Sequence, residues 1–182
     1  MPPDDPIAEH SAPANPYTAA DVLSILRERL WLSADPTAEQ LAWCERAATL
    51  LGHHANDLVG LASLLHQVFT YDAKQILRSP DSHAVLSRYA ARDVIRQLAL
   101  LLLDPKPFDS ERFKEVVTHL KETLEIRGRD LFHPLRLALS GRAGEGELDR
   151  VILLLDDASA LPFAVPVKSV RSRILEFCSA LD

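Results

Sequence analysis

The chain has 182 residues, of which 47% are hydrophobic and 25% are charged, the composition of a globular protein. Its net charge of −6 excludes a generally basic nucleic-acid-coating protein, so any RNA contact must come from a local patch. Cys44 and Cys178 lie far apart and indicate neither a disulfide nor a metal site. No apolar run reaches the length of a membrane span and no secretion signal opens the chain, which predicts a cytoplasmic protein without membrane contact.

The first part of the chain predicts a leader followed by three helices. Residues 1–16 contain five prolines and little to bury, so we expect a disordered leader that packs against nothing. Capping-box patterns at Thr18-x-x-Asp21 and Thr37-x-x-Gln40 predict the first two helix starts. Asn56 or Asp57 can cap the third helix.

The rest of the chain also predicts helices. The apolar spacing indicates that the longest one runs from Asp81 or Ser82 to Leu103, with Tyr89 on its apolar side. Near the C-terminus, the proline-flanked segment 163–167 is expected to pack in the core, with a docking strip for another protein as the alternative. Because every clear element is helical, the predicted fold class is all-α.

One stretch, residues 127–142, departs from an ordinary amphipathic helix. Gly128 offers a flexible turn, Asp130 is a plausible N-cap, and Pro134 lies close enough to the expected start to be tolerated. Gly141 stands where a helix-ending residue with positive φ is wanted.

The side chains of this stretch divide between two faces. Leu131, Leu135 and Leu139 share one face at helical spacing, whereas Arg136 points to another. Further arginines stand at the two ends of the helix. The stretch therefore predicts a helix that buries leucines and leaves a concentration of guanidinium groups around it.

The segment Asp130-Leu-Phe-His-Pro-Leu-Arg-Leu-Ala-Leu-Ser-Gly141 closely resembles the late C-terminal motif of bacterial glutamyl-tRNA synthetase. That motif reads roughly G-[KR]-x-L-[FM]-x-P-[LI]-R-x-A-[LV]-[TS]-G. The likeness continues weakly upstream at Glu45–Leu51 and at Phe69-Thr-Tyr-Asp72, and we estimate that it runs from about Trp31 to Leu155. It implies two packed helical subdomains like the family's anticodon-binding cage, residues 17–72 and residues 73–182, divided near Tyr71-Asp72.

The resemblance also implies an RNA-reading surface. In the family, the arginine of the Pro-Leu-Arg segment and the loop after Ser/Thr-Gly belong to the anticodon-reading surface. Carried over by position, these residues are Arg136, Gly144, Glu145, Gly146 and Leu148. Guanidinium groups can pair with phosphate or stack on an unpaired base, which adds Arg127, Arg129 and Arg142.

Two features oppose an RNA contact at this surface. The family often has Thr/Ser-Pro in the loop where this chain has Glu145-Gly146, and a carboxylate there would repel phosphate. Five acids accompany seven basic residues between Glu111 and Arg142. The alternative is therefore a solvated face with salt bridges, in which Arg136 pairs with an acid such as Glu145 or Glu147.

No catalytic residue, metal site or cofactor is predicted. The seven histidines show no zinc-type spacing, and neither a phosphate loop nor a Gly-x-Ser-x-Gly elbow is present. The resemblance covers only the non-catalytic part of the family. It therefore implies a free-standing, non-catalytic domain that binds tRNA, with tRNA-Glu as the candidate, through unpaired anticodon bases. The alternatives are a helical interaction module that lost RNA binding, and the non-catalytic part of a split synthetase whose partner is a separate catalytic chain.

Overall fold

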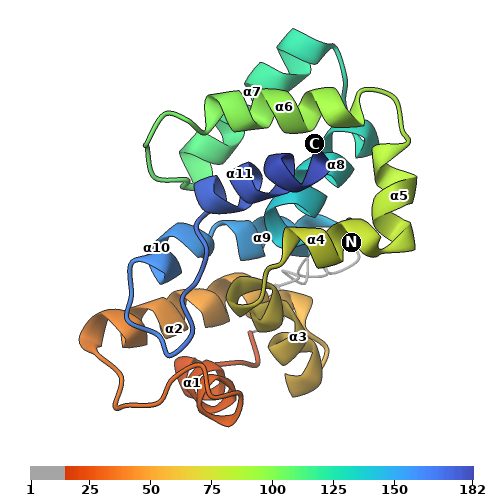
Figure 1. The fold of residues 1–182 in the computed structure, drawn as a ribbon. Helices are drawn as coiled ribbons and strands as arrows, with labels where there is room; N and C mark the ends of the chain where they lie inside the picture. Colours follow the sequence, from red (N-terminus) through yellow and green to blue (C-terminus); the bar gives the residue numbers. More distant parts are fainter. Residues whose placement is uncertain (1–14) are drawn as a thin grey trace, which may run out of the picture.

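A computed structural model describes residues 15–182 of the chain, and Figure 1 shows their arrangement. The predicted leader lies outside the described residues except for its last two positions. There the expectation of a leader that packs against nothing is wrong: the Asn15 side-chain amide donates to the Ala48 carbonyl at 2.7 Å. The same side chain fills the space beside Gly52, where an added Cβ would lie 2.1 Å from Asn15 Oδ1.

The described residues form helices and no strand, which confirms the all-α fold class. The elements are, in chain order, α1 (Ala19–Glu28), α2 (Ala38–Leu51), the short 3₁₀ helix η1 (Gly52–His54), α3 (Leu58–Phe69), α4 (Ala73–Arg78), α5 (Pro80–Leu86), α6 (Ala91–Leu101), α7 (Ser110–Leu124), α8 (Arg129–Ser140), α9 (Gly146–Ile152), α10 (Leu155–Ser159) and α11 (Val170–Leu181).

The helix starts that depend on local capping lie where the sequence predicts them. The Gln40 backbone N–H donates to Thr37 Oγ1 at 3.1 Å, and the Thr37 N–H donates to Gln40 Oε1 at 2.9 Å. Of the two residues considered for α3, Asp57 is the cap, and its carboxylate accepts from the Gly60 N–H at 2.7 Å. These bonds satisfy N–H groups that have no partner inside the helix.

The predicted longest helix is wrong, because the chain breaks into α5 and α6 around Tyr89. Ala90 has φ +61°, the left-handed conformation that turns the chain between the two helices. Tyr89 is 82% exposed instead of facing the core. The sequence does not reveal this break, because the apolar spacing continues across it and no glycine or proline marks the turn.

The start of α8 also differs from the prediction. Gly128, with φ +62°, precedes the helix, and Asp130 lies in its first turn and is not its N-cap. Pro134 consequently lies inside the helix, where it lacks the N–H that would donate to the Asp130 carbonyl. The leucine stripe is as predicted: Leu131, Leu135 and Leu139 are fully buried.

Helices α1, α2 and α3 lie at one end of the molecule and α6 and α7 at the other, with α4, α8, α9 and α11 between them (Figure 1). An aromatic cluster holds the first end together. Phe163 packs edge-on against Trp43 and Phe69, with ring centroids 5.4 and 5.1 Å apart. Phe163 is 8% exposed, so core packing, the expected role of this segment, is confirmed for that residue.

A single buried core includes residues on both sides of Tyr71-Asp72. The segment around Ala164, from the C-terminal half, packs against the first part of the chain. There the Ala164 N–H donates to the Trp31 carbonyl at 2.7 Å. The Trp43 indole N–H donates to the Leu154 carbonyl at 3.2 Å. The division into residues 17–72 and 73–182 stays a prediction, and these contacts tie its two halves together.

Arg173 of α11 joins the ends of two other helices. Its side chain is completely buried, and its guanidinium donates to the Val68, Gln67 and Leu139 carbonyls at 2.7, 2.9 and 3.1 Å. These carbonyls belong to the last turns of α3 and α8. Carbonyls in the last turn of a helix receive no hydrogen bond from an N–H of the same helix. The positive charge thus meets the negative ends of two helix dipoles, although burial lowers the pKa of Arg173 to about 10.

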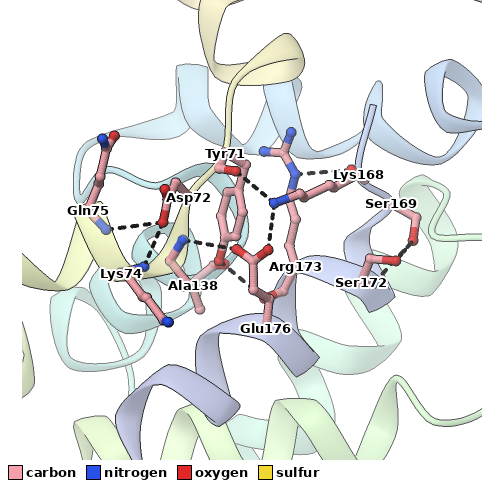
Figure 2. Close-up of polar contacts among 11 residues, drawn as sticks. Tyr71, Asp72, Lys74, Gln75, Ala138, Lys168, Ser169, Ser172, Arg173 and Glu176 are labelled. Carbon is pink, nitrogen blue, oxygen red and sulfur yellow. Dashed lines mark hydrogen bonds and ion pairs between the residues drawn. The ribbon is translucent and has the colours of Figure 1, made fainter. Parts of the chain in front are cut away.

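Tyr71 completes this junction (Figure 2). Its hydroxyl donates to the Ala138 carbonyl at 2.5 Å, and the Arg173 guanidinium lies over its ring at 4.7 Å from the centroid. Lys168 donates to the Tyr71 carbonyl at 2.9 Å and pairs with Glu176 at 2.5 Å. The last turn of α8 is therefore held from two sides, which fixes the direction in which the chain leaves it.

We predict that Arg173→Met destabilises the protein by roughly 3–5 kcal/mol, because it leaves several buried helix-end carbonyls without a donor. Urea denaturation followed by far-UV circular dichroism measures the change. Arg171→Met is the matched control, since Arg171 is exposed on the same helix. Equal stability of the two variants would contradict the role assigned to Arg173.

Candidate nucleic-acid interface

The predicted RNA-reading segment folds as one unit made of α8, α9 and the loop between them. Arg136 on α8 reaches across to α9, where its Nε and Nη2 donate to the two oxygens of Asp149 at 2.8 and 2.9 Å. Its Nη1 donates to the Gly144 carbonyl at 2.7 Å. The guanidinium also lies over the Phe132 ring, 4.8 Å from the centroid. One side chain therefore sets both the loop and the start of α9.

These contacts occupy the charged group that the sequence predicts for RNA. Arg136 is only 8% exposed, and a two-pronged bond to a carboxylate is among the stronger protein hydrogen-bond arrangements. The partner is Asp149, and neither Glu145 nor Glu147, the acids considered from the sequence. Direct contact between Arg136 and RNA stays a prediction, and the geometry favours an indirect role through the loop.

The loop after α8 has a buried base and an exposed tip. Leu148 is 3% exposed and packs so close to Gly144 that a Cβ there would lie 2.9 Å from Leu148 Cδ1. Glu145 and Gly146 are exposed. Among the loop residues predicted for RNA, Glu145 and Gly146 are exposed to solvent, whereas Leu148 is buried and packs against Gly144.

The arginines at the ends of α8 do not form one patch. Arg127 and Arg129 are exposed at its start, and Arg142 is exposed beyond its end. A helix of twelve residues separates the two ends by roughly 18 Å. RNA bound at one end would need an extended strand or a second contact to reach the other.

The structure instead gathers charges around His133 on α8. Arg88, in the turn between α5 and α6, places Nη1 3.1 Å from His133 Nδ1. Arginine can only donate, so the neutral ring accepts at Nδ1. Burial lowers the pKa of His133, and Arg88, Arg129 and Arg136 lower it further, while Glu145 acts in the opposite direction. Arg129, Arg136 and Glu145 from the sequence prediction thus all influence the pKa of this ring.

Sequence reasoning missed Arg88 because it lies far from the motif in the chain. The neighbouring Tyr89 carried a misleading signal, since its spacing fits an apolar helix face. No feature of the sequence marks the break that brings this turn onto α8.

The chain matches the anticodon binding domain family over residues 10–160. It therefore belongs to that family, and the resemblance seen in the motif around Arg136 is confirmed. The matched range extends beyond the Trp31–Leu155 region estimated from the motifs at both ends.

Two curated relatives show similar coverage. Glutamate–tRNA ligase 2 of Syntrophus aciditrophicus (strain SB) is 26% identical over 117 residues, which is 64% of this chain and 24% of that protein. Glutamate–tRNA ligase of Carboxydothermus hydrogenoformans is 25% identical over 130 residues, which is 71% of this chain and 26% of that protein. The matched part of this chain thus spans about a quarter of each relative's length.

A shorter match is closer in sequence: glutamate–tRNA ligase 2 of Coxiella burnetii (strain RSA 331) is 36% identical over 63 residues, 35% of this chain and 11% of that protein. No solved structure matches the chain. Within residues 15–182, no helix is long and apolar enough to cross a membrane. The same residues hold no group of three or more His, Cys, Asp or Glu side chains placed to bind a metal ion.

We predict that the Arg136–Asp149 pair contributes to stability more than an exposed pair does. A double-mutant cycle with Arg136→Ala and Asp149→Ala should give a coupling energy of about 1–3 kcal/mol. Their side chains are 10% and 21% exposed, so water screens them little.

The Arg46–Asp157 pair is the control for this cycle. Its side chains are 43% and 57% exposed, and such pairs typically couple by about 0.2–1 kcal/mol. Urea denaturation of each set of variants gives both values. A coupling energy no larger than that of the control pair would show that the Arg136–Asp149 pair does not hold the loop in place.

Proposed function

We propose that this chain binds tRNA through unpaired anticodon bases, as a non-catalytic domain of the glutamyl-tRNA synthetase type. The observation that carries the proposal is the family match across residues 10–160, which includes the whole α8–α9 segment. The names of the curated relatives, glutamate–tRNA ligases, favour tRNA-Glu among possible tRNAs. Cytoplasmic localisation is part of the proposal.

The structure supports a division of labour among the predicted RNA-binding residues. Arg127, Arg129 and Arg142 are exposed and can meet phosphates or bases. Glu145 and Gly146 form the accessible tip of the loop, and the Glu145 carboxylate can accept from a base amino group. Arg136, Gly144 and Leu148 act beneath them by fixing the shape of the loop. In this arrangement Arg136→Ala weakens binding because the loop moves.

The test is a titration of tRNA-Glu transcript against salt concentration. Phosphate contacts release counterions, so the logarithm of the affinity should fall linearly with the logarithm of salt. Arg129→Ala should weaken binding and make the slope shallower by about one. Arg27→Ala is the control, because Arg27 is exposed on α1, which lies at one end of the molecule and away from α8 (Figure 1).

A wild-type chain without measurable tRNA affinity would refute the proposal and favour a protein-interaction module. A tRNA-Glu transcript with a changed anticodon tests the site of contact. If it binds as tightly as the unchanged tRNA, the chain does not read unpaired anticodon bases.

The proposal assigns no catalysis to this chain alone. We predict that the purified chain neither exchanges pyrophosphate into ATP in the presence of glutamate nor charges tRNA. A separate catalytic synthetase chain, as in a split enzyme, would supply both reactions if it is a partner. Robust pyrophosphate exchange by the purified chain, absent from a mock purification of the same host, would overturn this assignment.

A further inference from the structure

The turn between α5 and α6 presents an aromatic ring to solvent. Tyr89 is 82% exposed, and within residues 15–182 no other aromatic side chain is among the exposed large hydrophobic ones. The following residue, Ala90, has φ +61°, a conformation that costs free energy for a residue with a Cβ. Ala91 and Val94, which begin α6, are buried. A backbone anchored in the core therefore holds the Tyr89 ring outward.

Two exposed arginines belong to this turn and to the part of α8 that it contacts. Arg88 precedes it and bonds to His133, and Arg129 lies one turn before His133 on α8 and lowers its pKa. Arg136 is already neutralised by Asp149. Arg88 and Arg129 are exposed and open to an anionic ligand, while Glu145 raises the pKa of His133.

We propose that Tyr89, Arg88 and Arg129 form a subsite for one unpaired nucleotide of a bound RNA loop. The base stacks on the Tyr89 ring, and the adjoining phosphate accepts from the guanidinium of Arg88 or Arg129. An exposed ring at the residue after Arg88, together with the guanidinium groups of Arg88 and Arg129, can meet the two chemical features of a single-stranded nucleotide, a π face and a phosphate. The subsite rests on the proposed function and extends it to residues outside the α8–α9 motif.

The position of the subsite fits one RNA strand that also meets the loop after α8. Arg136 donates to the Gly144 carbonyl of that loop at 2.7 Å and lies over the ring of Phe132, the residue before His133. The loop therefore lies beside the first turns of α8, next to the subsite. With Nδ1 accepting from Arg88, the neutral His133 ring carries its proton on Nε2 and keeps one donor free. Arg142, at the other end of α8, is too far away to share this nucleotide.

The test uses the anticodon stem-loop of tRNA-Glu as a hairpin RNA, with a fluorescent 2-aminopurine at each unpaired position in turn. Stacking is worth about 1–3 kcal/mol per base, so Tyr89→Ala should weaken binding by roughly 5- to 160-fold. Tyr89→Phe keeps the ring and should bind within roughly twofold of wild type. One labelled position should lose its stacking signal in Tyr89→Ala and keep it in Tyr89→Phe.

The salt dependence separates the ring from the charges. Tyr89→Ala should leave the slope of log affinity on log salt unchanged, whereas Arg88→Ala should make it shallower by about one. Leu100→Ala is the control, because Leu100 is 60% exposed on α6 and should bind the hairpin as wild type does. The side chains of Arg88, Tyr89 and Leu100 are exposed, so thermal melts should show that all these variants fold.

The outcomes distinguish this subsite from the function on which it rests. If wild type binds the hairpin and Tyr89→Ala binds equally well, the subsite is refuted and tRNA binding stands. If wild type binds neither the hairpin nor tRNA, the proposed function fails and the subsite fails with it.

Discussion

The buried guanidinium of Arg173 determines how the helices of this domain meet. It donates to carbonyls at the ends of α3 and α8 and to the Lys168 carbonyl before α11. Burying a charge is unfavourable unless its hydrogen bonds are made, and here backbone carbonyls supply all the acceptors. The same bonds satisfy carbonyls that two helices would otherwise leave unpaired. The position of α8, and of every side chain that it presents, depends on this junction.

A second arginine repeats the principle closer to the surface. Arg136 fixes the loop after α8 by binding Asp149 and the Gly144 carbonyl. Its positive charge is therefore paired with a carboxylate inside the protein. Arg88 and Arg129 differ because they are exposed and, within residues 15–182, no carboxylate binds either of them through two hydrogen bonds. The sequence motif contains arginines of both kinds. Burial and partners, which the motif does not show, separate those that shape the surface from those that can bind RNA.

Features that depend on neighbouring residues could be predicted from the sequence. The caps at Thr37 and Asp57, the leucine stripe of α8 and the turn at Gly141, with φ +86°, follow from local spacing and backbone preference. The reach of Arg173 to carbonyls more than a hundred residues away leaves no local signal. Ala90 adopts a left-handed conformation without the glycine that usually marks one. For that reason the Arg88–Tyr89 turn, and with it part of the candidate site, could not be foreseen.

The central claim is that RNA meets the exposed arginines while the buried ones hold the scaffold. NMR spectra of nitrogen-labelled arginine side chains, recorded as anticodon stem-loop RNA is added, test it directly. We predict that the Nε signals of Arg88 and Arg129 shift with increasing RNA, whereas those of Arg136 and Arg173 keep their positions. A shift at Arg136 as large as those at Arg88 and Arg129 would contradict the claim, because it would show that RNA competes with Asp149 for this guanidinium.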